Sequence, residues 1–321
     1  MKAIVGTEYG SPDGLRLEDV PIPSPGPKQV LVRVVAASLN ALDWHIMRGK
    51  PYAARIQTGF RRPKRPVRGV DAAGVVEEVG AEVTDFKPGD QVFGVCAGSF
   101  AEYGVSEAID ELAAKPEGLS YERAAALPIA GITALQAVRR AKLEAGQTLL
   151  VNGAAGGVGN FAVQIAAAMG AEVTGVCSKA NLETVRSSGA TTVVDYASED
   201  FTATGDRYDV VLDAVGNRSL GELRRCMRPG GTLVLMAPHP GDWIGPLILP
   251  LGAIITSKIR KERLLPILAK MNRDDLTTLG NLTAEGKISP VVSRTYSLGD
   301  AAEAMRHLET GHAVGKLVVT V

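Results

Sequence analysis

The sequence lacks an excess of either charge. Its 35 Lys and Arg residues are matched by 35 Asp and Glu residues, so the 321-residue chain has a formal net charge of zero. A neutral chain has no overall field that would draw it to nucleic acid or to an anionic membrane. The composition therefore predicts neither kind of partner, and function has to be sought in local sites.

Cysteine is also scarce. The chain has three cysteines, Cys96, Cys177 and Cys226, and no two of them form a C-x-x-C pair. An odd and sparse count argues against a disulfide framework and fits a reducing compartment. Without a C-x-x-C pair, a zinc site built from cysteines is not expected.

Long apolar runs are missing as well. The most apolar window, residues 243–257, is broken by Pro246 and Pro250. It is therefore expected to be buried core or a subunit contact rather than a membrane span. The chain opens with the strand-like segment MKAIVGTEYG, without a charged stretch followed by an apolar one. These features predict a cytoplasmic protein without a targeting segment.

What the sequence does contain is two styles of pattern, as expected for two domains in a chain of this length. The first third is rich in β-branched residues and turn signals, which predict strands. The last 35 residues return to this style. We therefore expect a mostly β domain formed by residues 1–122 and 287–321, with early strands at 29–38, 72–80, 90–95 and 99–105.

The middle of the chain alternates short apolar strands with amphipathic helices. Such alternation predicts a doubly wound parallel sheet of the Rossmann type, with right-handed crossovers, within residues 123–286. The fold class is therefore α/β, with a second, mostly β domain. The predicted strands are 147–153, 171–178, 191–196, 208–216 and 232–237, and the predicted helices are 158–169, 181–190 and 219–227.

A glycine-rich stretch, VNGAAGGVG at residues 151–159, joins the first of these strands to the first helix. Small residues let the backbone approach a pyrophosphate, which the unpaired N–H groups and the dipole of the helix N-terminus attract. Gly156 and Gly159 match the last two glycines of G-x-G-x-x-G, and Ala154 replaces the first. The order strand, glycines, helix predicts dinucleotide binding by Ala155, Gly156, Gly157, Val158 and Gly159. The alternative is a glycine-rich turn without a ligand.

The end of the second strand bears on the choice of dinucleotide. The segment GVCSKAN, residues 175–181, has no acidic residue to bind the 2′-hydroxyl of NAD. Ser178 can donate a hydrogen bond to a 2′-phosphate and Lys179 supplies positive charge. The segment therefore favours NADP(H) over NAD, unless Lys179 is an ordinary solvated lysine.

Together these motifs resemble the medium-chain dehydrogenase/reductase superfamily, in particular its zinc-free quinone oxidoreductase branch. The similarity is greatest to the reticulon-interacting NADPH oxidoreductases and spans essentially the whole chain. It implies a GroES-like β domain, a Rossmann domain that binds NADP(H), and a homodimer. The segments that carry it are 87–94, 125–137, 151–159, 195–201 and 311–319.

The resemblance also shows what has been lost. Zinc-dependent members of the superfamily hold the metal with Cys, His and Cys, and the matching positions here are Asn40, Val70 and Ala130. Val70 and Ala130 cannot coordinate zinc, and the four-cysteine lobe is missing. We therefore expect no metal site and a hydride transfer to a small-molecule acceptor that is already electrophilic, a quinone or an α,β-unsaturated carbonyl.

The resemblance places Asn40, Asp43 and Tyr52 near the reacting atoms, with Asn40 and Tyr52 expected to polarise the substrate oxygen. Each has a structural alternative: Asn40 caps a turn, Asp43 orders the loop, and Tyr52 is a surface residue. The further residues that the resemblance assigns to the cofactor are Thr133, Val215 and Gly216 beside the nicotinamide and Tyr196 beside the 2′-phosphate.

Several features stay open at the level of sequence. The basic segment 61–66 is expected to be a solvated loop, or else a guide for an anionic substrate. His312 follows Gly311, which caps the preceding helix in one interpretation. Neither His312 nor the loop 239–260 receives a role from the sequence. Two other functions also remain open: an NADP-dependent alcohol or aldehyde oxidoreductase, and a sensor that binds NADPH without turnover.

Overall fold

The computed structural model describes residues 1–108, 110–236 and 262–321. The apolar window 243–257 and the loop 239–260 therefore lie outside the described residues. The chain divides into two compact units, Met1–Ile132 with Lys270–Val321 and Thr133–Ala269. Here they are called the first and the second unit.

The division between the units differs from the sequence-based boundaries at 122/123 and 286/287. One division falls inside the helix α4 (Pro128–Ala141), so this helix starts in one unit and ends in the other. The other comes before the helix α9 (Arg273–Ala284), which packs on the strand β7 (Leu112–Ala114) of the first unit. Arg273 fixes this contact, because its Nε donates to the Leu112 carbonyl at 3.2 Å and its Nη1 lies 2.7 Å from Asp85.

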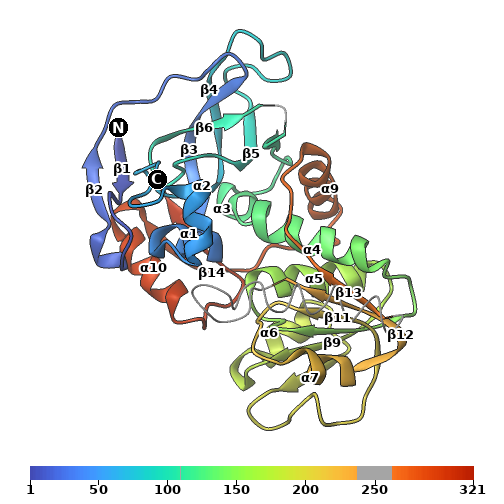
Figure 1. Ribbon diagram of the computed structural model, residues 1–321. Helices are drawn as coiled ribbons and strands as arrows, with labels where there is room; N and C mark the ends of the chain where they lie inside the picture. The colour runs from blue at the N-terminus through green and yellow to red at the C-terminus, as the bar shows by residue number, and fades with distance from the viewer. Residues whose placement is uncertain (109, 237–261) are drawn as a thin grey trace. The chain divides into compact units, whose positions relative to one another are not determined.

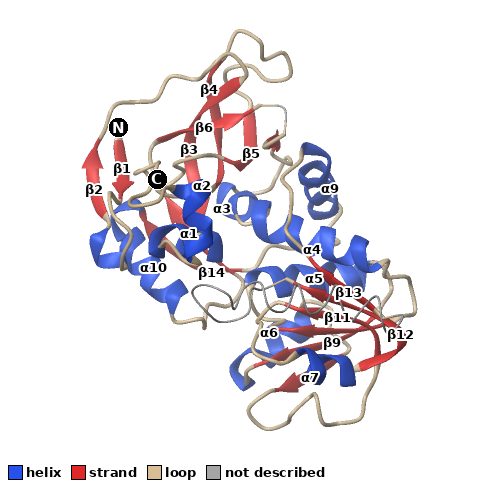
Figure 2. Ribbon diagram, in the orientation of Figure 1, coloured by secondary structure: helices blue, strands red, loops and turns tan. Residues whose placement is uncertain are grey.

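The first unit is built around a mostly antiparallel sheet (Figure 2). The strand β3 is its centre and pairs with β4, β6 and β15. Among the described strands of this sheet, β14 and β15 run parallel and the other pairs are antiparallel. Side chains alternate across β3, so that Val30, Val32 and Val34 enter the apolar core while Arg33 is exposed. The strands are β3 (Gln29–Ser38), β4 (Asp71–Val79), β5 (Gln91–Val95), β6 (Tyr103–Glu107), β7, β14 (Val292–Ser297) and β15 (Lys316–Thr320).

Helices and a hairpin complete this unit. The helices α1 (Ala41–Arg48) and α10 (Ala301–Glu309) pack together, and Trp44 Nε1 donates to Glu309 at 2.8 Å. A short 3-10 helix, η2 (Tyr52–Ala54), leads into α2 (Arg55–Thr58). The remaining elements are η1 (Pro12–Gly14), α3 (Tyr121–Ala125), η4 (Leu298–Asp300) and the pair β1 (Lys2–Val5) and β2 (Arg16–Asp19).

The second unit contains a parallel sheet in the order β10-β9-β8-β11-β12-β13, so the predicted doubly wound sheet is confirmed. The helices α5 (Gly157–Ala168) and α7 (Leu220–Arg225) lie on opposite faces of it (Figure 1), as right-handed crossovers in opposite directions require. The strands are β8 (Thr148–Asn152), β9 (Glu172–Cys177), β10 (Thr192–Asp195), β11 (Tyr208–Asp213), β12 (Met227–Leu235) and β13 (Arg263–Pro266), and the remaining helices are η3 (Lys179–Asn181) and α6 (Leu182–Ser187).

The strand order reverses direction between β8 and β11. From β8 the chain moves outward to β9 and β10, and from β11 it moves the other way to β12 and β13. In open parallel sheets the crevice beyond the carboxyl ends of the strands at such a point binds ligands. The fold therefore directs attention to the residues that follow Asn152 and Asp213.

Candidate functional site

Three glycines at the turn between β8 and α5 differ in backbone conformation and in the space around them. Gly153 has φ of 84°, a left-handed conformation that favours glycine. Gly159 lies so close to the preceding turn that a Cβ atom would sit 2.1 Å from the Gly153 carbonyl oxygen. Gly156, the N-cap of α5, is not confined: its Cβ would meet nothing nearer than that oxygen at 3.5 Å.

The turn glycine does not lie where the fingerprint predicts it. In the sequence, Ala154 stands at the position of the first fingerprint glycine. In the structure Gly153, one residue earlier, supplies the left-handed turn, and Ala154 is fully buried. Ala154 packs beneath Gly175 of β9, where an added Cβ would lie 3.0 Å from the Ala154 Cβ. The turn glycine thus lies one residue earlier than in the fingerprint, whereas Gly156 and Gly159 keep their positions.

A side-chain link joins the two strand ends at the reversal point. Asn152 Nδ2 donates to Asp213 Oδ1 at 2.9 Å, and the same carboxylate oxygen accepts the backbone N–H groups of Val215 and Gly216, each at 3.2 Å. Asp213 therefore holds the turn that contains two residues predicted to contact the nicotinamide. Sequence reasoning missed Asn152 and Asp213, although both are polar residues at the ends of apolar strands.

The residues predicted to select NADP(H) come together at the carboxyl ends of β9 and β10. Asp195 pairs with Cys177, and the Tyr196 N–H donates to the Cys177 carbonyl at 3.2 Å. Ser178 follows directly, and its Oγ accepts a hydrogen bond from Asn181 Nδ2 at 3.0 Å. Lys179 is exposed and Tyr196 is 49% exposed, so both side chains are accessible. The half-buried Thr133 lies on α4.

The first unit contains a buried polar network. Asn40, the N-cap residue of α1, donates from Nδ2 to Asp71 Oδ2 at 2.9 Å and accepts a hydrogen bond from Lys316 Nζ through Oδ1. Lys316 Nζ also lies 3.8 Å from Asp71 Oδ2. Asp43 Oδ2 accepts the Asn40 backbone N–H at 2.8 Å. All four side chains are at most 5% exposed, so their charges and hydrogen bonds depend on one another.

Burial shifts the pKa of each charged group in this network. Burial, with the nearby charge of Asp71, raises the pKa of Asp43 from 3.8 to about 7. The pKa of Asp71 rises to about 6, because burial outweighs the opposing effect of the Lys316 ammonium. Burial lowers the pKa of Lys316. The two carboxyl groups therefore gain protons at a much higher pH than exposed aspartates do.

The structure brings two of the three predicted catalytic residues together. Asn40 and Asp43 share the network and make the contacts of the structural alternative: Asn40 caps α1 and Asp43 bonds to the Asn40 backbone. Tyr52 lies outside the network, on η2, with the Arg55 guanidinium 4.7 Å from its ring centroid. A catalytic role for each of the three stays a prediction.

The positions that match zinc ligands carry other contacts. The Asn40 amide is engaged at both ends, as described above. Val70 lines a cavity and Ala130 is 2% exposed in α4. Within residues 1–108, 110–236 and 262–321, no group of three or more His, Cys, Asp or Glu side chains is arranged to hold a metal ion.

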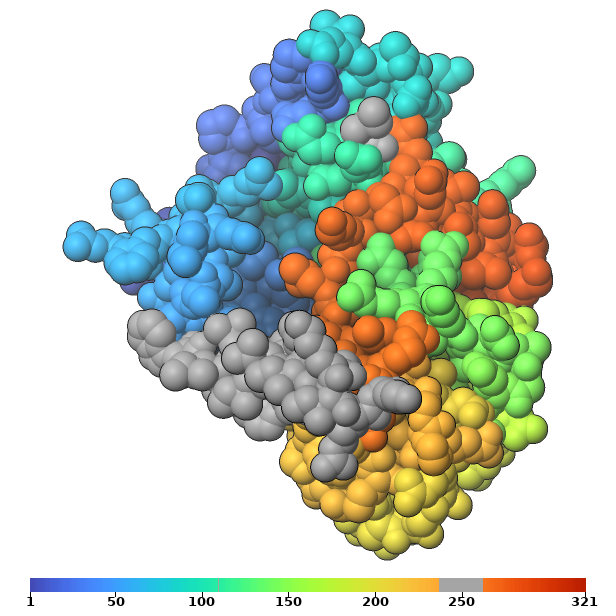
Figure 3. Space-filling view, turned by 45° about the vertical axis from the view of Figure 1, so that its right-hand side comes forward, coloured from blue at the N-terminus to red at the C-terminus, as the bar shows by residue number. Residues whose placement is uncertain are grey.

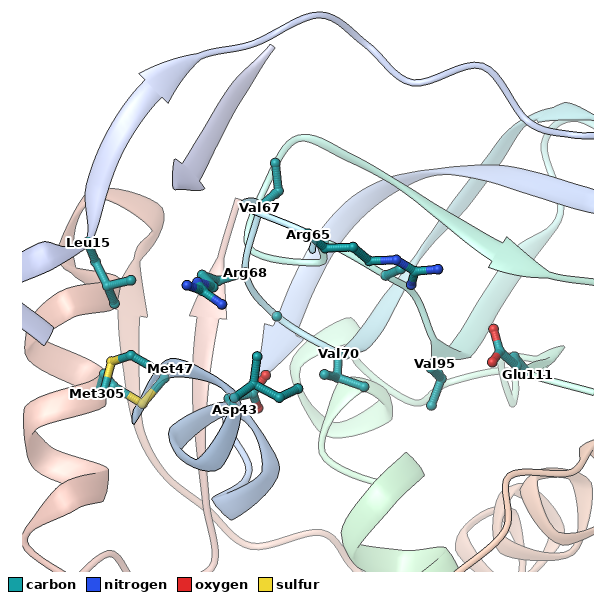
Figure 4. Close-up of a pocket in the computed structure, with 14 residues that line it drawn as sticks. Leu15, Asp43, Met47, Arg65, Val67, Arg68, Val70, Val95, Glu111 and Met305 are labelled. Carbon is teal, nitrogen blue, oxygen red and sulfur yellow. The ribbon is translucent and has the colours of Figure 1, made fainter. Parts of the chain in front are cut away.

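A cavity of about 150 Å³ lies in the first unit beside this network (Figure 4). Asp43 belongs to its wall, as do Arg65, Arg68 and Glu111. Between these charged groups the wall is apolar, and Met47 and Met305 lie at one end of the close-up. The basic segment 61–66 thus contributes Arg65 to a cavity wall, although Arg65 is exposed overall, as Arg61, Arg62 and Lys64 are.

The end of α10 and the segment near residue 60 both lie on the surface. Gly311 has φ of 72°, which fits the capping interpretation, and His312 is exposed. Ile56 and Phe60 are each 79% exposed, and their segment projects from the surface (Figure 3). No helix among the described residues has the length and apolar character needed to span a membrane.

Comparison with known families and proteins covers both units. The family described as alcohol dehydrogenase GroES-like domain matches residues 26–117, and that described as zinc-binding dehydrogenase matches residues 188–319. The chain is 33% identical to quinone-oxidoreductase QR1 of Triphysaria versicolor over 99% of this chain and 98% of the relative. It is 34% identical to the NADPH-dependent alkenal/one oxidoreductase of Arabidopsis thaliana, over 99% and 79%, and 32% identical to the NAD(P)H oxidoreductase RTN4IP1 of Bos taurus, over 100% and 89%.

Solved structures give the same result. The quinone oxidoreductase from Coxiella burnetii superposes with a TM-score of 0.88 at 34% identity, covering 100% of this chain and 99% of that one. The Escherichia coli quinone oxidoreductase complexed with NADPH has a TM-score of 0.83 at 25% identity, with full coverage of both chains. The fold and the site thus define a two-domain oxidoreductase, a GroES-like domain with a Rossmann domain. Within that class, the chain belongs to the quinone oxidoreductase branch of the medium-chain dehydrogenase/reductase superfamily, which confirms the resemblance seen in the sequence.

The glycine turn gives a first test, by stability. Gly159→Ala is expected to destabilise the protein by about 2–4 kcal/mol, because the new methyl group meets a backbone carbonyl that cannot move away. Gly156→Ala, the matched control, is expected to cost less than about 1 kcal/mol, since its φ of −74° is ordinary and its surroundings are open. Urea denaturation measures both. Equal losses in the two variants would contradict the assignment of the packing role to Gly159.

The buried network gives a second test, by pH. Folded Asp43 keeps its proton up to about pH 7, whereas in the unfolded chain it ionises near 3.8. Its ionisation therefore destabilises the fold as the pH rises through this window, and the penalty is complete above it. Asp43→Asn removes the penalty, and its Oδ1 can still accept the Asn40 N–H. We therefore compare the free energies of unfolding of the variant and the wild type. The difference, variant minus wild type, is expected to be larger at pH 8 than at about pH 4.5, by on the order of 2 kcal/mol.

Urea denaturation at the two pH values measures this difference. The exposed Asp206 provides the matched control, because Asp206→Asn removes a carboxylate that water already solvates. The relative stability of this control should stay level between the two pH values. If the stability of Asp43→Asn relative to wild type is also the same at the two pH values, the fold does not hold Asp43 in its protonated form.

Proposed function

We propose that the protein is an NADPH-dependent, zinc-independent reductase of quinones or α,β-unsaturated carbonyl compounds. The observation that carries the proposal is the β8–α5 turn at the reversal point of the sheet, where Gly156 leaves open the space that a side chain would fill. The relatives support it: one is named an NADPH-dependent alkenal/one oxidoreductase and another a quinone oxidoreductase.

The turn fits the diphosphate of a dinucleotide. Gly156 is the N-cap of the 12-residue helix α5, which begins with Gly157 and Val158. Its first N–H groups lack intrahelical acceptors and favour an anion. Ala155 and Gly159 keep the adjoining backbone small, so that nothing bulky separates the turn from the ligand. These five residues would hold the diphosphate.

The adenosine end explains the preference for NADPH. Lys179 provides a mobile positive charge, and Ser178 and Tyr196 provide hydroxyl groups at the neighbouring ends of β9 and β10. No carboxylate occupies the end of β9, residues 175–181, where a 2′-hydroxyl would need one. Lys179 would attract a 2′-phosphate.

We assign the nicotinamide end of the cofactor to the turn after β11. Val215 and Gly216 are fixed by the Asp213 carboxylate, and Thr133 is the third residue that we assign to this end of the cofactor. NADPH, when bound, supplies the hydride. The part of the protein is to orient the acceptor, exclude water and place a hydrogen-bond donor near the oxygen that gains negative charge.

The side chains at the positions that match zinc ligands support zinc independence. Of the three positions that match zinc ligands, two carry aliphatic side chains, Val70 and Ala130. At the third, the Asn40 amide already donates to Asp71 and accepts from Lys316. An acceptor that is electrophilic by itself, such as a quinone or an enone, does not need a Lewis acid for hydride addition.

Catalytic assignments follow from accessibility. Tyr52 is half-buried and carries a hydroxyl, so we assign it the role of hydrogen-bond donor to the substrate oxygen. Asn40 and Asp43 are at most 5% exposed and hold the start of α1, so we assign them to shaping the site around the substrate. Assembly as a homodimer and a cytoplasmic location remain predictions from the sequence.

The cofactor assignment can be tested at Lys179. Lys179→Ala should weaken NADPH binding about tenfold or more and leave NADH binding within about twofold, since only NADPH carries the 2′-phosphate. Lys87→Ala, a change at an exposed lysine of the first unit, serves as the control. Titration of cofactor fluorescence gives the affinities. Equal affinities of the wild-type protein for the two cofactors would overturn the preference for NADPH.

Turnover tests the reductase itself. Oxidation of NADPH is followed with a panel of quinones, enones and simple aldehydes. Tyr52→Phe should lower kcat about tenfold or more and leave NADPH affinity unchanged, because the lost hydroxyl acts on the acceptor. Full rates in this variant would remove Tyr52 from the mechanism. Tight NADPH binding with no turnover on any acceptor would favour the non-catalytic sensor.

A further inference from the structure

The cavity of the first unit contains a buried guanidinium, that of Arg68, with unused hydrogen-bond donors among the described residues. Arg68 is 5% exposed, and its Nη2 donates to the Gly6 carbonyl at 2.5 Å. Its Nε and Nη1 have no hydrogen-bond partner among the described residues. Gly6 makes room for the guanidinium, since a Cβ there would lie 2.7 Å from the Arg68 Nε. The guanidinium thus occupies a space shaped for it, with donors unused.

The charged groups of the wall differ in how they are compensated. Glu111 is affected by Arg65, whose charge opposes the rise that burial causes in the pKa of Glu111. These two residues lie together at one end of the close-up, and Arg68 lies apart from them (Figure 4). The charges of Arg65 and Glu111 can therefore compensate each other. The remaining carboxyl group of the wall that could compensate the charge of Arg68 is Asp43.

Asp43 is a poor counter-ion for Arg68. Its Oδ1 has no hydrogen-bond partner among the described residues, although it belongs to the same cavity wall. Burial and the charge of Asp71 raise its pKa to about 7, so near neutral pH much of it is uncharged. In that form its hydroxyl can donate a hydrogen bond. Beside Arg68 the cavity thus has a cation and a potential donor, while its other carboxyl group, Glu111, lies with Arg65.

The size and the remaining walls limit what can enter. The cavity volume of about 150 Å³ can hold an apolar group of roughly six carbon atoms, such as a benzene ring. The apolar wall would pack against such a body, while a guanidinium is suited to a carboxylate. The apolar side chains of the wall are Leu15, Ile46, Met47, Val67, Val70, Val95 and Met305.

We propose that this cavity binds a small organic carboxylate, with the carboxylate on Arg68 and the apolar body against the methionine and valine side chains. The carboxylate could belong to a substrate of the reductase or to a free acid that is not reduced. Only the first of these sources rests on the proposed function. In either case the cavity makes the protein selective for an acidic compound.

Direct binding tests the proposal without any cofactor. Isothermal titration with benzoate and with its neutral counterpart benzamide, near pH 6.5, should show binding of benzoate at least about tenfold tighter. Arg68→Met should remove this preference, whereas Arg61→Met, at an exposed arginine outside the cavity wall, should keep it. Equal binding of benzoate and benzamide to the wild-type protein, or benzoate binding unchanged in Arg68→Met, would overturn the proposal.

A second variant covers the chance that Arg68→Met fails to fold. Val95→Phe fills the cavity from its wall and leaves the guanidinium in place, so benzoate binding should be lost while circular dichroism is retained. Retained benzoate binding in a folded Val95→Phe protein would place the ligand elsewhere. A crystal structure grown with benzoate that shows only water in the cavity would also overturn the proposal.

Turnover then separates the two sources. NADPH oxidation is compared with 4-oxopent-2-enoate, an enone that carries a carboxylate, and with its methyl ester. A lower KM for the acid that Arg68→Met abolishes identifies a substrate carboxylate. No difference between acid and ester, together with tight benzoate binding, identifies a free acid. If no acceptor is reduced at all, the proposed function fails but the binding result still decides this proposal.

Discussion

The close approach of Gly159 to the Gly153 carbonyl is the constraint on which the rest of the second unit depends. It lets α5 start directly above the end of β8, so the first turn of the helix faces the crevice where the strand order reverses. The turn after β11 meets the same place, because a Cβ on Gly153 would lie 2.5 Å from Val215. A dinucleotide site follows from this backbone geometry, and side chains such as Lys179 then determine which dinucleotide is preferred.

The first unit uses a different kind of constraint. Its network buries Asp71 and Lys316, where each charge costs free energy unless it is paired. Asn40 bonds to both and ties the start of α1 to β4 and β15. The position that carries a zinc ligand in metal-dependent relatives thus takes part in a buried hydrogen-bond network, and it holds the start of α1, the helix that contributes Asp43 and Met47 to the cavity wall.

Both units contain buried polar atoms without partners. In the second unit, one oxygen of Asp213 accepts three N–H groups and fixes a turn, whereas its Oδ2 has no partner among the described residues. In the first unit, Arg68 and Asp43 have such atoms as well, and both residues line one cavity. Buried polar atoms of this kind are costly to keep, which is why they indicate a bound molecule more strongly than an apolar cavity would.

The sequence by itself determined the alternation of strands and helices, the glycine turn, the lack of an acidic residue after β9 and the loss of zinc ligands. The first three features depend on neighbouring residues and on their periodicity, so local physics is enough to predict them. The loss of zinc ligands is what the resemblance to the family implies. Only the tertiary structure decided that Gly153 makes the turn, that Asn152 meets Asp213, and that Lys316 reaches Asn40 across 276 positions of the chain. Such meetings depend on strand register and packing, because residues far apart in the chain are brought together only when the sheet forms.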